Sequence, residues 1–178
     1  MNDIIKKNGV AFGFLTGLCS VLITTLIYII DLKLFTSFWL GIINKGIYLS
    51  IGIFLLVKTK KELKSIFSFK DAFTTYFISA VIGIVITVIF NIILFNFIDP
   101  GAKVTIKELT IKFAVEMMEK FNAPADTVNQ AIKEMQKEDQ FSIVQLLKGS
   151  IFSVLFSAVL GLILAAIFKS KSPLSQEL

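Results

Sequence analysis

The chain has 178 residues, of which 55% are hydrophobic and only 17% are charged, and its mean hydropathy is +0.80. Soluble domains carry roughly 25% charged residues, so this composition excludes an ordinary water-soluble protein and indicates a single integral membrane domain over residues 1–178. The formal charge is +5, but the sequence has no arginine, no histidine and one cysteine, Cys19, so we expect no nucleic-acid partner, no cofactor and no Cys/His metal site.

Four apolar windows are each long enough to cross a hydrocarbon layer of about 30 Å, which takes about 20 helical residues. They cover residues 9–30, 38–57, 72–98 and 149–168, and the first and third contain no charged residue. The first window follows two lysines, as a signal peptide does, but no small-residue cleavage site comes after it. The sequence therefore predicts an all-α membrane protein with four transmembrane helices.

The distribution of lysine predicts which side of the membrane each loop faces. One side, formed by the N-terminus, residues 58–71 and the tail after Phe168, holds nine lysines and four acidic residues. The opposite side, residues 31–37 and 99–142, holds seven lysines and nine acidic residues. Because cations resist translocation, lysine-rich short loops stay in the cytoplasm. We therefore expect a multi-pass protein of the cell (inner) membrane with both termini cytoplasmic.

Aromatic residues near the window ends agree with this orientation. Tyrosine and tryptophan rings favour the headgroup level, because one end of each ring is apolar and the other is polar. Tyr28, Phe38 and Trp39 flank the outer interface in this arrangement, and Tyr76 lies near the inner one.

The segment between the third and fourth windows has the pattern of a helical hairpin. From residue 103 to 121, apolar residues recur at spacings of three and four, whereas charged residues of alternating sign fill a separate stripe made of Glu108, Lys112, Glu116 and Lys120. Asn122, Ala123 and Pro124 interrupt the pattern, and a thinner apolar stripe follows to about residue 139. We therefore expect an extracytoplasmic amphipathic helical hairpin over residues 103–140.

Small residues at four-residue spacing mark a face on each window. In lipid, helices associate largely through close packing of small residues and through hydrogen bonds, so these faces are predicted to point inward. Ile82 and Ile86 are free to face lipid or a neighbouring helix. The ladders are Gly9, Gly13 and Gly17, then Ser20 and Thr24, in the first window, Gly41, Lys45, Tyr48 and Gly52 in the second, Thr75, Ser79, Gly83, Thr87 and Asn91 in the third, and Gly149, Ser153, Ser157, Gly161 and Ala165 in the fourth.

Lys45 is the only charged residue well inside a window, and intramembrane ionisable residues are costly and usually partnered. It lies about 10 Å below Phe38 if the helix rises about 1.5 Å per residue. Three interpretations remain open for its ammonium group. It reaches back toward the outer headgroups, it pairs with Asp99 or with the amides of Asn91 and Asn96, or it takes part in the passage of a substrate or ion.

The other polar candidates have structural interpretations as well. Asn44, Asn91 and Asn96 suit hydrogen bonds between helices, which contribute about 0.6 kcal/mol each on average. Asp99, followed by Pro100 and a glycine, indicates the end of the third helix. Enzyme motifs are missing: there is no glycine-rich phosphate loop, HExxH or GxSxG, and no acidic residue lies deep in a window, so we expect no enzymatic activity.

The order of these features resembles a bacterial membrane-protein family known as domain of unknown function 4199. The matching parts are the glycine-rich first window, a lysine-rich inner loop leading into residues 68–73 (SFKDAF), the exit NFIDP at residues 96–100, and the methionine- and glutamate-rich stretch EMMEK at residues 116–120. A final window rich in small residues closes the chain. The resemblance implies the architecture and a bacterial membrane setting, and it supplies no catalytic residues.

Two hypotheses for function follow. In the first, the protein is non-enzymatic, and its outer hairpin contacts membrane lipid, a second copy of the chain or another membrane protein. The apolar stripe of the hairpin motivates it, because four short helices leave part of that stripe uncovered. In the second, the chain is a component of a small transporter or channel, with Lys45, Asn44 and Asn91 around a polar cavity.

Overall fold

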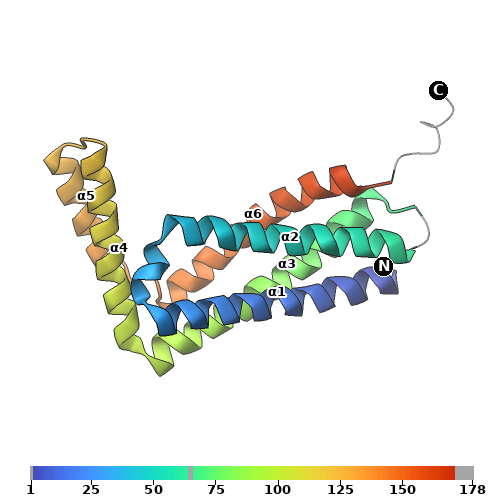
Figure 1. The fold of residues 1–178 in the computed structure, drawn as a ribbon, viewed down its shortest axis with the longest axis horizontal. Helices are drawn as coiled ribbons and strands as arrows, with labels where there is room; N and C mark the ends of the chain where they lie inside the picture. Colours follow the sequence, from blue (N-terminus) through green and yellow to red (C-terminus); the bar gives the residue numbers. More distant parts are fainter. Residues whose placement is uncertain (1, 64–65, 171–178) are drawn as a thin grey trace.

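The computed structural model describes residues 2–63 and 66–170, and over these residues every regular element is helical (Figure 1). Lys64 and Lys171, two of the lysines counted for orientation, lie outside the described residues. In chain order the elements are α1 (Asp3–Ile30), η1 (Leu32–Thr36), α2 (Phe38–Leu63), α3 (Phe69–Ile93), η2 (Leu94–Ile98), α4 (Pro100–Lys120), α5 (Ala125–Lys137) and α6 (Ile143–Phe168). The η1 segment is a 3-10 helix, and η2 is a π-helical turn that continues α3.

Four helical stretches are long and apolar enough to cross a membrane: α1, α2, α3 continued by η2, and α6, with 28, 26, 30 and 26 residues. They contain the four windows expected from the sequence, and each extends beyond its window. Side-chain caps explain two of the extensions. Ser68 and Asp71 form a reciprocal capping box at the start of α3, and the Ser142 side chain accepts a hydrogen bond from the backbone N–H of Gln145 at the start of α6.

The most intimate helix pair is α1 with α3, and glycine makes the close approach between them. A Cβ atom added at Gly13 would lie 2.7 Å from Cβ of Ile82, and one added at Gly17 would lie 2.7 Å from Cβ of Ile86. These distances are shorter than two carbon atoms can adopt without displacement, because carbon pairs pack best at about 3.5–4.0 Å. The ladders of the first and third spans therefore form one interface, and the two isoleucines pack against the glycines.

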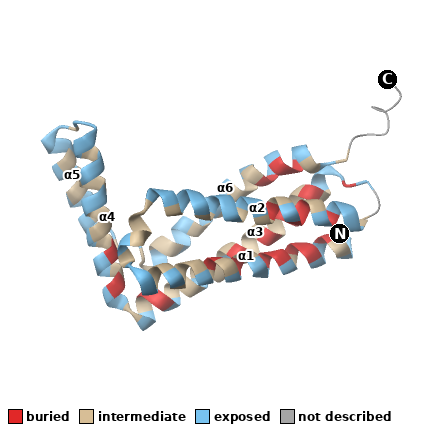
Figure 2. Ribbon diagram, in the orientation of Figure 1, coloured by how far each residue is buried: buried red, intermediate tan, exposed pale blue. Residues whose placement is uncertain are grey.

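The end of the bundle that carries the N-terminus is densely packed, and Figure 2 shows buried residues gathered there. Tyr76 of α3 lies between Gly52 of α2 and Gly161 of α6, where added Cβ atoms would lie 2.7 and 2.9 Å from its ring. The Tyr76 side chain is only 9% exposed, so it packs in the core instead of facing the headgroups. The residues buried together with it are Leu56, Phe67, Ala72, Leu164 and Ala165.

The opposite end of the bundle is more open. Gly41, Gly46 and Gly149 have no atom within 4 Å of an added Cβ atom. Helices α2 and α6 each pack on α3, but they make few contacts with each other. The small-residue faces of the second and fourth spans therefore pack closely only in the half of the bundle near the N-terminus.

Helices α4 and α5 form a smaller unit that runs across this open end of the bundle (Figure 1). Asp99 ends the third span, as expected, and also caps α4, with Pro100 in the first turn. The chain then reverses after α4 at Asn122, whose φ of 54° is one that asparagine tolerates better than most residues. Helix α5 packs back along α4.

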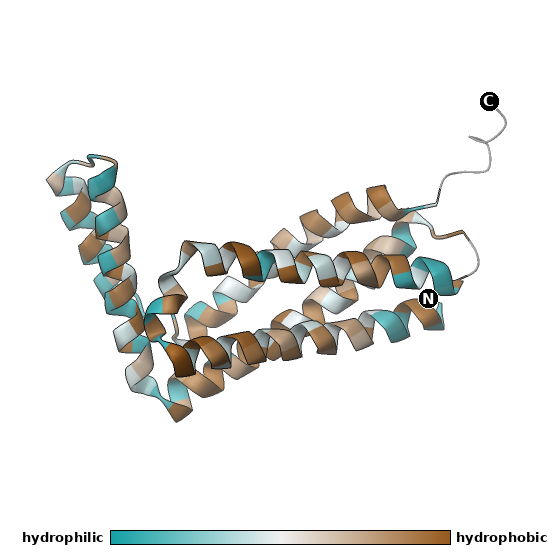
Figure 3. Cartoon of the chain, viewed as in Figure 1, coloured by the Kyte–Doolittle hydropathy of each residue, from teal (hydrophilic) through white to brown (hydrophobic). Residues whose placement is uncertain are grey.

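Helix α4 is apolar on two sides, so the single apolar stripe expected from the sequence describes it incompletely. Ile106 is 1% exposed and packs with the end of α3. A second set of partly buried residues lies on the same side as Lys107, whose ammonium group donates a hydrogen bond to the carbonyl of Gln136 in α5; this set is Ile111, Ala114, Val115 and Met118. Apolar and polar residues consequently alternate closely along the hairpin in Figure 3.

The glycine interface gives a direct test of the fold. We expect Gly13→Ala to lower the free energy of unfolding by about 2 kcal/mol, the usual scale for overpacking a well-packed interface. Gly46→Ala, where nothing lies within 4 Å, should leave stability unchanged or raise it, because alanine favours helices over glycine by about 1 kcal/mol. Unfolding in detergent, followed by circular dichroism, measures both. Equal stability of the two variants would contradict the α1–α3 contact.

Candidate functional site

A cavity of about 640 Å³ lies in the half of the bundle nearest the hairpin. It is lined by residues of α2, α3 and α6, with Thr16 and Ser20 of α1 also in its wall. Its volume falls within the range of about 300–1,000 Å³ that is typical of small-ligand sites. Tyr76 forms its inner end, and Gln140 and Gln145 lie at the end nearest the hairpin.

Small residues on α6 leave the space open. Gly149, Ser153 and Ser157 follow one another at four-residue spacing and all line the cavity. In an α-helix this spacing keeps the three residues on one face. Glycine has no side chain and serine has a short one, so neither fills the space toward α2. The ladder of the fourth span thus lines the cavity near the hairpin, and its Gly161 packs against Tyr76.

Hydrogen-bond donors that lack a partner among the described residues lie near the hairpin end of the cavity. Lys45 and Tyr48 of α2, Asn91 of α3 and Gln145 of α6 all line it, and their side chains make no hydrogen bond to any residue that the structure describes. Several of the lining hydroxyls differ, because they donate to carbonyls of their own helices, as Ser153 does to Gly149. The free donors are therefore available to a ligand.

Lys45 gives the cavity its charge. Its side chain is exposed, and no aspartate or glutamate lines the cavity. The lining therefore carries one positive charge together with neutral donors, which suits an anion better than a cation. Beside Lys45 the lining has the hydroxyl of Tyr48 and the amides of Asn91 and Gln145, an arrangement that supports binding of a polar anionic group.

The structure places the five candidate residues in three different locations. Lys45 and Asn91 share the cavity, whereas Asn44, on the same helix, is partly buried outside its lining. Asn96 and Asp99 lie at the corner between α3 and α4, where they have other partners. The suggested pairing of Lys45 with Asp99 or Asn96 is therefore not what the structure shows, and Asn91 is the one suggested amide that lines the same space.

At the corner between α3 and α4, Asp99 links the start of the hairpin to α1 by a hydrogen bond. The hydroxyl of Tyr28 donates to its carboxylate over 2.8 Å, and the backbone N–H of Ala102 donates to it over 3.0 Å. These bonds, the Tyr28 bond foremost, lower the pKa of Asp99 below its ordinary value because they favour the charged carboxylate. An ionised Asp99 also suits the N-terminus of α4.

A second group of polar contacts links α4 and the end of α3 to the segment that precedes α6. The ammonium of Lys103 lies 2.8 Å from the carboxylate of Asp139, and the Asn96 amide donates to the carbonyl of Phe141 over 2.9 Å. Partial burial raises the pKa of Asp139, but the bonds from Lys103 and from the backbone of Phe141 outweigh it, so the pKa is lowered overall. The Phe141 ring packs 4.2 Å from that of Phe95. We call this region, residues 95–103 together with residues 139–141, the hairpin root. It is held by both polar and aromatic contacts.

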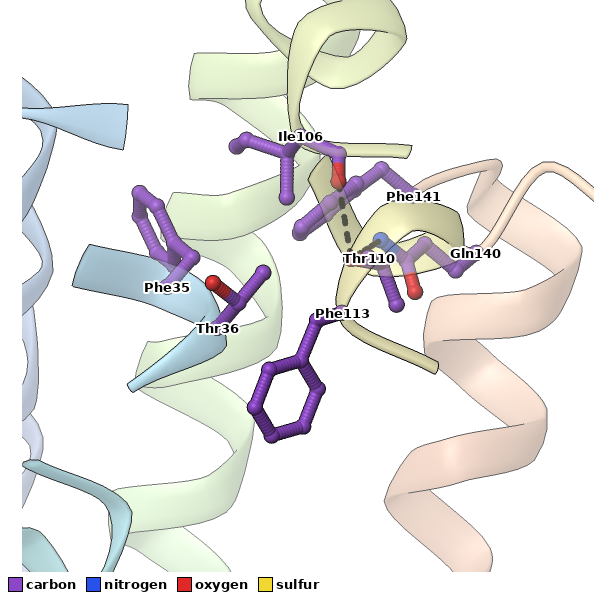
Figure 4. A pocket seen from close by; sticks show the side chains of 7 residues that line it. All are labelled: Phe35, Thr36, Ile106, Thr110, Phe113, Gln140 and Phe141. Carbon is purple, nitrogen blue, oxygen red and sulfur yellow. Dashed lines mark hydrogen bonds between the residues drawn. The ribbon is translucent and has the colours of Figure 1, made fainter. Parts of the chain in front are cut away.

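A smaller cavity of about 390 Å³ lies between η1 and α4 (Figure 4). Phe35 and Thr36 of η1 face Ile106 and Phe113 of α4 across it. Its hydrogen bonds are internal, from the Thr110 hydroxyl to the Ile106 carbonyl and from the Gln140 amide to Thr110. It contains no charged side chain, so we regard it as a groove under α4 and not as a ligand site.

Comparison with known protein families identifies the family of this chain. A family model described as protein of unknown function DUF4199 matches residues 11–170, which is most of the chain. The chain belongs to this family. The resemblance identified from the sequence is confirmed, and the four long apolar helices described above are those of a DUF4199 protein. No curated protein and no solved structure matches the chain.

Sequence reasoning on this DUF4199 chain missed the residues that join its parts. Gln145 had a local signal, because Ser142 three positions earlier is a typical helix N-cap that moves the start of α6 ahead of Gly149. The bonds from Tyr28 to Asp99 and from Lys103 to Asp139 had no such signal, because their partners are 71 and 36 residues apart. Only the packed chain brings these groups together.

The lowered pKa of Asp139 predicts how the hairpin root responds to acid. A carboxylate with a lowered folded-state pKa stabilises the native structure above its unfolded value of about 3.9, and this contribution is lost as the pH falls through the folded value. We expect Asp139→Asn to reduce hydrogen-exchange protection of the Phe141 amide about fivefold at neutral pH, the scale of a partly exposed ion pair. In the unsubstituted chain this protection should fall as the pH is lowered through the pKa of Asp139, and the variant should not show that decrease. Glu138→Gln is the matched control, and an equal effect of both substitutions would contradict this role.

Proposed function

We propose that this protein is a non-enzymatic, multi-pass protein of the bacterial inner membrane whose α4–α5 hairpin lies on the outer face and contacts lipid headgroups. Both termini are then cytoplasmic. The lysine bias between the two sets of loops supports this orientation, because the lysine-rich loops remain inside. The hairpin lies at the opposite end of the bundle from the start of α1 and the end of α6 in Figure 1.

The observation that carries the lipid contact is a line of exposed apolar residues on α4. Phe113, Met117 and Phe121 recur every four residues, and their exposed fractions are 38%, 36% and 78%. They continue the face of α4 on which Ile106 is buried: Phe113 lines the groove beside η1, and Met117 and Phe121 lie farther along the hairpin. Helix α4 runs across the end of the bundle and past its side (Figure 1). In the proposed embedding, this part of α4 lies at the level of the outer membrane surface. Exposed apolar side chains at this level favour contact with the headgroup and acyl boundary of a bilayer.

The absence of catalysis in the proposal rests on the residue types. The sequence has no histidine, and the larger cavity brings no carboxylate near Lys45. Proton transfer needs a positioned acid or base whose pKa suits the task. A second copy of the chain or another membrane protein is the alternative occupant of the hairpin face.

The second candidate function is a component of a transporter or channel, and the cavity with Lys45 and Asn91 favours it. Passage across the membrane needs a polar path from one side to the other. Below Tyr76 the bundle is closed by Leu56, Leu164 and Ala165, which are at most 5% exposed. This packing supports binding in the cavity more than passage through it.

Site-directed labelling tests the orientation. In a Cys19→Ala background, Asn129→Cys in α5 should react with a membrane-impermeant maleimide on spheroplasts. Asp3→Cys, at the start of α1, should react only after lysis. Both positions are exposed, so accessibility depends on the compartment and not on burial. The reverse labelling pattern would contradict the proposed topology.

Tryptophan quenching tests the lipid contact. With the single tryptophan removed by Trp39→Phe, Phe121→Trp should be quenched in bilayers that contain brominated phosphatidylcholine, because the ring lies against the lipid. Glu119→Trp, on the charged side of the same helix, should remain bright. Equal emission from the two variants would contradict lipid contact. A disulfide-linked dimer of Phe121→Cys would then assign the face to a second copy.

A further inference from the structure

The larger cavity has one opening that suits a lipid. It is closed at its inner end, where Tyr76 packs against Gly52 and Gly161. On the side between α2 and α6 it is open, because these helices both pack on α3 and make few contacts with each other near the hairpin. In a membrane this opening faces the acyl chains and headgroups of one leaflet. A molecule that enters from the lipid needs no path across the bundle.

The donors of the cavity are placed at the depth of a headgroup. Lys45 lies seven residues from the start of α2, and Asn91 lies seven residues from the end of η2. At about 1.5 Å per residue both lie roughly 10 Å below the helix ends. Gln145 is in the first turn of α6. All three line the cavity toward its hairpin end, on the side from which a polar headgroup of the outer leaflet enters.

The charge and the rim of the cavity define the chemical class of the ligand. The lining has one ammonium group and no carboxylate, so a negative group is favoured. Phe152 and Phe156 of α6 also line the cavity and are 73% and 59% exposed, so they present apolar surface beside the polar donors. An anionic headgroup joined to acyl chains satisfies both surfaces, whereas a free inorganic anion uses only the donors.

We infer that the cavity between α2, α3 and α6 is a binding site for an anionic phospholipid of the outer leaflet, with its phosphate on Lys45 and Asn91 and its acyl chains leaving between α2 and α6. Basic pockets between transmembrane helices are known places for acidic headgroups. The ammonium is then neither a group that only reaches toward the surface nor one that guides transport. It holds a lipid within the bundle.

The experiment uses the full chain, purified in detergent and titrated with phosphatidylglycerol or with phosphatidylcholine. Native mass spectrometry reads the lipid-bound fraction. We expect phosphatidylglycerol to bind about tenfold more tightly, and Lys45→Gln to remove this preference, because a hydrogen bond to a charged group is lost. Lys33→Gln, in the exposed η1 segment outside the cavity, is the matched control and should leave the preference intact.

A second variant fills the cavity without changing charge. Ser153→Leu places an apolar side chain against the site and should weaken phosphatidylglycerol binding while the melting temperature is kept, because leucine suits a membrane helix. Equal binding of the two lipids, or equal effects of Lys45→Gln and Lys33→Gln, would overturn the inference. Displacement of the lipid by millimolar inorganic phosphate would also overturn it, in favour of a free anion.

This inference rests on the membrane embedding proposed above, and its failure can be distinguished from failure of that proposal. Release of the protein from membranes by alkaline carbonate would contradict the embedding itself. Loss of lipid preference in a protein that stays in the membrane fraction would contradict only the site. The role of the hairpin is tested separately by the quenching experiment.

Discussion

The fold depends on the close approach of α1 and α3. Lipid chains are as apolar as leucine, so helices in a membrane gain little by hiding apolar side chains from one another. Gly13 and Gly17 solve this problem by letting Ile82 and Ile86 of α3 pack directly against the backbone of α1. Dispersion between closely packed atoms then supplies the attraction. With α1 fixed on one side, α3 becomes the central helix on which α2 and α6 also pack.

The same constraint explains why the bundle is closed at one end and open at the other. Near the N-terminus Tyr76 fills the space that Gly52 and Gly161 leave, and the layer around it is nearly free of solvent. Toward the hairpin Gly149 and Ser153 meet no such large residue, so the space remains as a cavity. Small residues therefore have two opposite effects here, and the facing residue decides which one occurs.

The hairpin is held by a different kind of interaction. Its root lies beyond the apolar spans, where hydrogen bonds and charges are less costly to arrange. Asp99 accepts from Tyr28 and caps α4, while Lys103 pairs with Asp139. These few polar contacts help to set the direction of α4 across the end of the bundle, and Phe121 at its far end is left 78% exposed.

The sequence by itself determined the four spans, the helical segment between the third and fourth of them, and the family. These follow from long apolar runs, from local spacing and from short motifs, all of which are properties of neighbouring residues. It also singled out Lys45 and Asn91, because polar groups inside a span are rare. Only the tertiary structure decided that Lys45 and Asn91 share a cavity while Asn96 and Asp99 serve the hairpin root. The physical reason is that a small residue in a span allows close packing where a large side chain faces it and leaves a space where none does. The facing residue comes from a distant part of the chain, so local sequence does not reveal it.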